Sequence, residues 1–208
     1  MKRVLFAVLL LALAAPAHAA IIGVGTGTGA PPATLGGYSI AQWTPPGIYG
    51  YTPVASAGTG PGGVTAAFTG AGMQGICIQC GDWATWSHGF AGQGYYSGGS
   101  TSVLMTLSSP VSAFLFYAEP NPFTVIRMTA TAQDGTSVTL DVDGASGAQG
   151  FGFYGTGGST ITSVSFVSDA DFALAEFGSN TDGRVPDPGS SLLLLGLGLA
   201  GLAWRKRA

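Results

Sequence analysis

The chain has two cysteines, Cys77 and Cys80, in a Cys-x-x-Cys spacing. Two thiols at this spacing close a small disulfide loop or act as a redox pair. A redox pair needs a helix after the second cysteine to lower a thiol pKa, and the residues that follow predict none. Zinc needs four ligands, and His88 is the one histidine after residue 20. We expect a disulfide that holds the loop beside Trp83, with a redox pair as the alternative.

His88 lies next to a serine in the sequence Thr-Trp-Ser-His-Gly-Phe. A histidine held by an acidic residue can act as the general base of a serine nucleophile. The chain lacks the Gly-x-Ser-x-Gly turn that presents such a serine in many hydrolases. We therefore expect a loop residue here and no catalytic residues, and we do not predict an enzyme.

Acidic residues form two short runs, Asp141-x-Asp143-Gly and Asp169-x-Asp171, with Glu176 a little further along the chain. Calcium takes roughly six to eight oxygen ligands, many of them from carboxylates. These five residues are therefore candidates for a calcium site, although neither run has all the carboxylates of a calcium-binding loop. The alternative is that they are solvated turn residues, and no other cofactor is expected.

Four aromatic residues, Trp83, Trp86, Tyr95 and Tyr96, follow the cysteine pair closely. Aromatic faces stack on sugar rings in glycan-binding modules, and they also fill protein cores. The sequence permits both interpretations, so these residues are candidates for a sugar-binding surface or for the core.

The elements that must position these residues are strands. Short runs rich in β-branched and aromatic residues recur between Gly and Pro turns, as in 38–43, 63–68, 75–80 and 83–90, and then from 101 onward. Asp134-Gly135 between two such runs predicts a hairpin, because Asp and Gly tolerate the positive φ of a tight turn. Alternation of Val138, Leu140 and Val142 places one face of the second arm in the core. We predict an all-β protein, an antiparallel jelly-roll-like β-sandwich.

Few charges lie between the two chain ends. Residues 20–184 contain two cationic residues, Arg127 and Arg184, against nine acidic ones, which gives a formal charge of −7. A nucleic-acid-binding domain needs a basic surface, so nucleic acid is excluded as a partner.

Residues 1–19 have the layout of a secretory signal peptide. Lys2 and Arg3 precede an apolar stretch that ends at Ala15, and Ala17-His18-Ala19 is a small-residue cleavage site. We expect signal peptidase to cut before Ala20. The glycine-rich segment 20–33 that follows is predicted to be flexible.

The C-terminus is built in the opposite order, with an apolar run before the cations Arg205, Lys206 and Arg207. Cations beside a hydrophobic span favour the cytoplasmic side of the membrane, so the C-terminal end of the chain is predicted to remain in the cytoplasm. Residues 190–204 are predicted to form one short transmembrane helix, of about 22 Å at about 1.5 Å per residue. A hydrocarbon core measures about 30 Å, so this span is a marginal anchor.

The tail as a whole resembles the PEP-CTERM sorting signal of Gram-negative bacteria. Val185, Pro186, Asp187 and Pro188 stand where that family has its Pro-Glu-Pro motif, and the apolar span and the three cations follow. The resemblance covers residues 185–208 and implies processing by an exosortase, in bacteria that make exopolysaccharide. The two prolines keep the motif extended, which suits a protease cleft. A plain C-terminal membrane anchor is the alternative.

Together these features predict one secreted domain, residues 20–184, between two targeting segments. The precursor is expected to be held in the inner membrane by its tail and the product to reach the cell surface or the extracellular matrix. A structural or adhesive role there is the expected function, with exopolysaccharide as a possible partner. A lectin-like glycan-binding module is the alternative.

Overall fold

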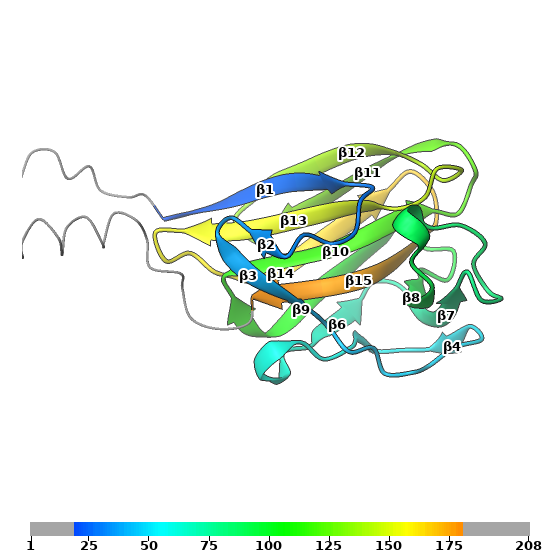
Figure 1. Cartoon of the computed structure of the whole chain (residues 1–208), viewed down its shortest axis with the longest axis horizontal. Coiled ribbons are helices and arrows are strands. Elements are labelled where there is room, and N and C mark those ends of the chain that lie inside the picture. The colour runs from blue at the N-terminus through cyan, green and yellow to red at the C-terminus, as the bar shows by residue number, and fades with distance from the viewer. Residues whose placement is uncertain (1–18, 181–208) are drawn as a thin grey trace, which may run out of the picture.

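Two antiparallel sheets pack face to face in the computed structural model, which describes residues 19–180 (Figure 1). The predicted segments at 1–18, at Val185 to Pro188, at 190–204 and at Arg205 to Arg207 lie outside the described residues. Among the residues described, no helix is long and apolar enough to cross a membrane.

The first sheet has nine strands, and its central strands are β10 and β15. In spatial order its main path is β1 (Ala20–Gly27), β13 (Gln149–Thr156), β10 (Ala113–Pro120), β15 (Phe172–Asn180), β8 (Gly92–Tyr96), β7 (Gln74–Ile78) and β4 (Thr52–Pro53). A short hairpin of β2 (Thr34–Leu35) and β3 (Tyr38–Gln42) joins this sheet where β3 pairs with the end of β15.

The second sheet has six strands. Their order is β12 (Ser137–Asp143), β11 (Val125–Ala132), β14 (Ile161–Ser168), β9 (Ser102–Val111), β6 (Ala66–Thr69) and β5 (Ser56–Ala57). Strands β8 to β15 lie in the order 8-15-10-13 in the first sheet and 12-11-14-9 in the second, and each changes sheet from the one before it except β12, which pairs with β11. This is jelly-roll order, and it confirms the predicted fold class.

The main core lies between the sheets and is built largely from phenylalanine rings. Phe116 stacks on Phe151 with ring centroids 5.6 Å apart, and Phe166 meets both rings edge-on. Alternation explains the arrangement, because every second side chain of a strand points to the same face. Strand β9 shows the pattern clearly, with Val103, Met105 and Leu107 buried and the residues between them exposed.

A second apolar layer covers the outer face of the first sheet. All eight residues of β10 are buried, so this strand is covered on both faces. Leu115 and Tyr117 of β10 pack outward against Trp83 and Trp86, which come from the segment after β7. We call this cluster the outer layer, and it positions the residues of the site described below.

The predicted hairpin around Asp134-Gly135 is confirmed. Strands β11 and β12 pair from Val125↔Asp143 to Thr131↔Ser137, and Gly135 has a φ of 90° in the turn between them. Val138 and Val142 are buried as the alternation predicted, and Leu140 packs against the same core.

Two expectations about individual segments are wrong. Residues 20–27 of the supposedly flexible segment form the edge strand β1, paired with β13. Its glycines allow close packing: a Cβ on Gly23 would lie 2.6 Å from Val138, and one on Gly25 would lie 2.9 Å from Leu140.

The segment 83–90, expected as a strand, contains a single β-bridge at Trp83 and a 3-10 turn at Ser87–Gly89. Its large apolar residues cover a sheet instead of extending one.

Candidate functional site

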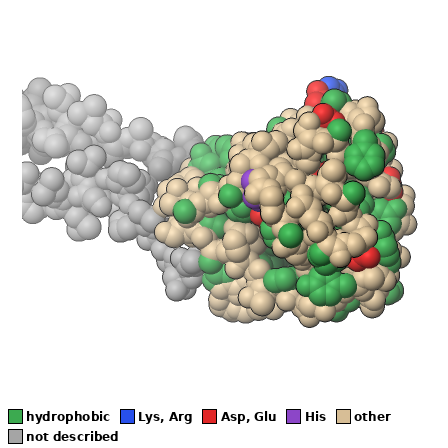
Figure 2. All heavy atoms as spheres, turned by 45° about the vertical axis from the view of Figure 1, so that its right-hand side comes forward, with side chains coloured by type: hydrophobic (Ala, Val, Ile, Leu, Met, Phe, Trp, Pro, Cys, Tyr) green, Lys and Arg blue, Asp and Glu red, His purple; other side chains and the backbone are tan. Residues whose placement is uncertain are grey.

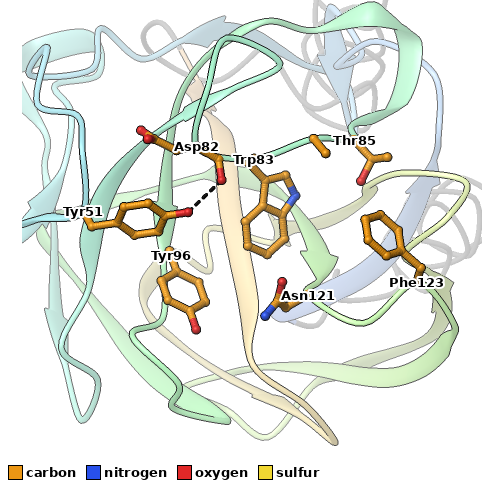
Figure 3. Close-up of a pocket in the computed structure, with 8 residues that line it drawn as sticks. Tyr51, Asp82, Trp83, Thr85, Tyr96, Asn121 and Phe123 are labelled. Atoms are coloured by element: carbon orange, nitrogen blue, oxygen red, sulfur yellow. Dashed lines mark hydrogen bonds between the residues drawn. The ribbon is translucent and has the colours of Figure 1, made fainter.

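A pocket opens at one end of the first sheet, beside the outer layer (Figure 3). Its volume is about 260 Å³, slightly below the range of about 300–1,000 Å³ typical of small-molecule sites. It is lined by Tyr51, Asp82, Trp83, Ala84, Thr85, Tyr96, Asn121 and Phe123. These residues come from four separate segments, which the sheet brings together.

Aromatic rings form the walls of the pocket. Tyr96 lies between two other rings: Tyr51 meets it edge-on at 6.0 Å and 90°, and Trp83 lies 5.9 Å away at 44°. Phe123 closes the far side and leaves 66% of its surface exposed. Apolar faces that are already fixed by their neighbours can receive a ligand at little entropic cost.

The loop that carries Trp83 is braced by the cysteine pair. Cys77 and Cys80 form a disulfide, as the sequence predicted. The carboxylate of Asp82 accepts the backbone N–H of Cys77 at 2.8 Å and that of Gly50 at 3.2 Å. Asp82 therefore links the cysteine loop to the loop that carries Tyr51.

The hydroxyl groups of the pocket all donate to protein acceptors. Tyr51 donates to the carbonyl oxygen of Asp82 at 2.7 Å, and Tyr96 donates to Asp171 Oδ2 at 2.7 Å (Figure 3 draws the first). The hydroxyl of Thr85 lies in hydrogen-bond contact with Glu119. The bond to Asp171, followed by burial, raises the pKa of Tyr96 to about 12, so its proton stays in place at neutral pH.

Glu119 lies beneath the pocket and is fully buried. Burial raises the pKa of its carboxyl group to about 7, although Thr85 and Trp83 oppose the rise. Its second oxygen, Oε2, has no partner with hydrogen-bond geometry among the residues described. The Thr85 hydroxyl also lies 3.3 Å from the carbonyl oxygen of Gly144. A protonated Glu119 could donate from Oε1 to Thr85, which would then donate to Gly144, and the unpaired Oε2 would carry no charge.

A second polar cluster surrounds Glu176 on β15. Glu176 Oε1 lies 2.9 Å from His88 Nε2, and its Oε2 accepts the indole N–H of Trp86 at 2.7 Å. Burial raises the pKa of the Glu176 carboxyl group, opposed by these two hydrogen bonds. On the other side of the ring, His88 Nδ1 lies 3.1 Å from Ser87 Oγ and 3.2 Å from the carbonyl oxygen of Thr28.

This serine, histidine and glutamate are in contact. Nδ1 of His88 faces both the Ser87 hydroxyl and the Thr28 carbonyl, which can only accept; in a tautomer that donates from Nδ1 to Thr28, this nitrogen has no lone pair for a proton from Ser87. His88 and Glu176 have φ values of 44° and 53°, left-handed conformations uncommon for such residues. The cluster therefore serves as a clasp between the segment after β1 and the first sheet.

Four of the five carboxylates proposed for calcium have separate partners, and the fifth is exposed. Asp141 pairs with Arg127 at 3.1 Å, Asp143 caps the turn at Ser146, and Asp171 holds Tyr96. Glu176 belongs to the clasp, and Asp169 is exposed. Within residues 19–180 the structure brings no three His, Cys, Asp or Glu side chains together in a way that could hold a metal ion.

The four aromatic residues proposed for sugar stacking separate into two pairs. Trp86 and Tyr95 are 6% and 2% exposed and belong to the cores, so they offer no face to a ligand. Trp83 and Tyr96 line the pocket.

The sequence analysis did not identify three other pocket residues, Tyr51, Asn121 and Phe123, which lie far from the cysteine pair in the sequence. Asn-Pro-Phe at 121–123 resembles any other turn in sequence, and strand pairing alone brings it beside Tyr96.

Charge is sparse on the surface, and Figure 2 shows a face with few charged side chains. Arg127 is the one lysine or arginine in residues 19–180, and it lies on the second sheet. The pocket therefore has no cationic side chain among its lining residues.

Fold and site define a jelly-roll β-sandwich with an aromatic pocket at one end. Comparison with protein families adds that residues 184–207 match the PEP-CTERM protein-sorting motif. The C-terminal segment of the chain therefore carries an exosortase-dependent sorting signal, which supports an exported, membrane-anchored precursor that reaches the cell surface. No curated protein matches the chain.

Proposed function

We propose that this protein is a glycan-binding adhesive protein of the cell surface or extracellular matrix, and that exopolysaccharide is its partner. The pocket walled by Tyr51, Trp83, Tyr96 and Phe123 is the observation that carries this proposal. Sugar rings have apolar C–H faces and polar hydroxyl edges, and the pocket offers aromatic faces beside hydrogen-bonding oxygens.

Its place in the fold supports the proposal. The pocket lies at one end of the first sheet, where residues from four separate segments of the chain meet. Lectin domains are among the known uses of the jelly roll, which adds support by fold analogy only. A binding role rather than catalysis agrees with the geometry of His88, and the separate partners of the carboxylates favour binding without calcium.

A glycan array with the full chain in detergent micelles tests the proposal, provided that the detergent has no sugar headgroup. We expect binding that survives a metal chelator and falls at least tenfold in Tyr51→Ala and in Phe123→Ala. Tyr49→Ala and Val125→Ala are the matched controls, because these residues are 46% and 59% exposed and lie outside the pocket lining.

Two outcomes would overturn the proposal. Binding to no glycan would remove the function, and equal losses in the control variants would remove the pocket as its site. Urea unfolding of each variant shows whether it is folded. Substitutions of exposed residues are expected to change the free energy of unfolding by less than about 0.5 kcal/mol.

A further inference from the structure

The pocket presents mainly hydrogen-bond acceptors to a ligand. The hydroxyl hydrogens of Tyr51 and Tyr96 point to protein acceptors, and Thr85 is occupied by Glu119. Only the oxygen lone pairs of these hydroxyl groups remain available to a ligand. Asn121 donates one N–H to Asp171 at 2.9 Å and keeps its carbonyl oxygen and one further N–H. Such a lining suits a ligand that brings its own donors.

The charged side chains around the pocket are acidic. Asp82 lines it, and Asp171 lies directly behind Tyr96 and Asn121. Each uses Oδ2 for structural hydrogen bonds, while Oδ1 has no partner among the residues described. The single described cation, Arg127, is already paired with Asp141 on another sheet. A carboxylate or sulfate would meet neither a cation nor a cluster of donors here.

The aromatic walls add attraction for positive charge. An ammonium group within about 6 Å of a ring face interacts favourably with the ring's quadrupole, most strongly with tryptophan. Tyr96 packs within 6.0 Å of Tyr51 and within 5.9 Å of Trp83, so three rings border one small space. Phe123 adds a fourth ring at the rim.

We propose that this pocket recognises an unacetylated amino sugar of a polysaccharide, with the ammonium group between the aromatic rings and the acceptor oxygens. This inference rests on the proposed glycan-binding function and names the class of sugar. An ammonium has three donors and no acceptor, which matches the lining of the pocket. An N-acetyl group removes the charge and two of these donors.

Binding of four matched oligosaccharides to the full chain tests the inference. The probes are tetramers of glucosamine, N-acetylglucosamine, glucose and glucuronate, measured by calorimetry in micelles without sugar headgroups. We expect glucosamine to bind about tenfold more tightly than the N-acetylated and neutral tetramers, as one cation–π contact with partial desolvation allows. Glucuronate is expected to bind least.

A charge placed in the pocket should reverse this order. Ala84 lines the pocket and is exposed, so Ala84→Lys adds a cation without disturbing a core, and Ala84→Gln is the control of similar length. We expect Ala84→Lys to lose the preference for glucosamine and to gain affinity for glucuronate. Ala84→Gln should keep the wild-type order.

The outcomes distinguish the two proposals. Equal affinity for glucosamine and glucose, or preference for glucuronate, would overturn the amino-sugar inference and leave glycan binding intact. Binding of none of the four tetramers, nor of any array glycan, would overturn both. Full displacement of the glucosamine tetramer by choline at matched concentration would show that the pocket binds any organic cation without recognising the sugar. That result would overturn the amino-sugar inference.

Discussion

At the scale of single residues, burial of Glu119 links stability to pH. A glutamate in an unfolded chain has a pKa of about 4.3, whereas burial raises that of Glu119 to about 7. Between these two values the folded protein holds a proton that the unfolded chain has released. The stability contributed by this group is therefore complete below about pH 4.3 and is lost as the pH rises towards 7.

We predict that Glu119→Gln removes this pH dependence. The amide cannot ionise, so at pH 8 the variant should be more stable than the wild type, by on the order of 2 kcal/mol. Urea unfolding at pH 5 and pH 8 measures the effect. Glu176→Gln is the control and should keep the part of the pH dependence that belongs to Glu119. The same slope in wild type and Glu119→Gln would contradict the prediction.

Trp86 gives a second prediction at this scale, because its hydrogen bond marks it as structural. Trp86→Phe keeps a buried ring but removes the N–H that Glu176 accepts, which should cost about 1–3 kcal/mol of unfolding free energy. Its affinity for glycans should stay within twofold of the wild type. A large loss of affinity in a folded Trp86→Phe protein would contradict the prediction and would show that Trp86 takes part in glycan binding.

Only part of the site could be predicted from individual residues. The disulfide follows from residue types, and two of the four aromatic candidates, Trp83 and Tyr96, do lie in the pocket. Which tryptophan borders the pocket could not be predicted, because both are buried and alternation within strands does not apply to the irregular segment 83–90. The positive φ of His88 and Glu176 has no sequence signal either, since Glu176 lies at a bulge in β15 and His88 lies in the 3-10 turn.

At the scale of elements, the segment from the end of β7 to the 3-10 turn at Ser87–Gly89 holds the site in place. It has little regular structure of its own, and its position depends on the disulfide, on Asp82 and on the packing of Trp83 and Trp86 on the outer layer. The fold itself was more predictable, because hairpins such as β11–β12 combine a turn signal with strict alternation. The packing of β1 on β12 could not be predicted, because glycines that allow two strands to approach closely also occur in flexible segments.

We predict that removing the disulfide weakens glycan binding while the protein remains folded. The loop between Cys77 and Cys80 is very short, so the entropic stabilisation it provides is about 2 kcal/mol. Cys77→Ser/Cys80→Ser should remain folded, with glycan affinity reduced about tenfold because Trp83 and Asp82 lose their support. Adding reductant to the wild type should give the same loss and should leave the double variant unchanged. Unchanged affinity in the double variant would show that the loop is held by packing alone.

At the scale of the whole molecule, both ends of the described chain lie at one end of the sandwich (Figure 1). Thr156 Oγ1 donates to the carbonyl oxygen of Ala20, and Asn180 Oδ1 accepts the backbone N–H of Ser112, which directly precedes the neighbouring strand β10. Asn121 and Phe123 follow the opposite end of β10. The nine residues of β15 span about 30 Å, so the pocket lies roughly that far from the chain ends.

We predict that this arrangement orients the pocket away from the membrane while the predicted tail anchor is still attached. Residues 181–189 separate Asn180 from the predicted transmembrane segment and reach at most about 30 Å when fully extended. The end of the sandwich that carries Ala20 and Asn180 must therefore stay near the lipid surface. A pocket at the far end could already bind polymer before an exosortase releases the protein.

Labelling of introduced cysteines in the membrane-held precursor tests this orientation. Ser109→Cys lies near the end of β9 at the chain-end side, and Val125→Cys lies at the pocket side; both positions are exposed, and Cys77 and Cys80 are oxidised. We expect a bulky maleimide to react several-fold faster at 125 than at 109 in intact spheroplasts, because lipid headgroups shield the nearer position. The two rates should become equal in detergent or after the tail is cleaved. Equal rates at both positions in spheroplasts would mean that the domain tumbles freely on its tether, and the pocket would then have no fixed outward orientation.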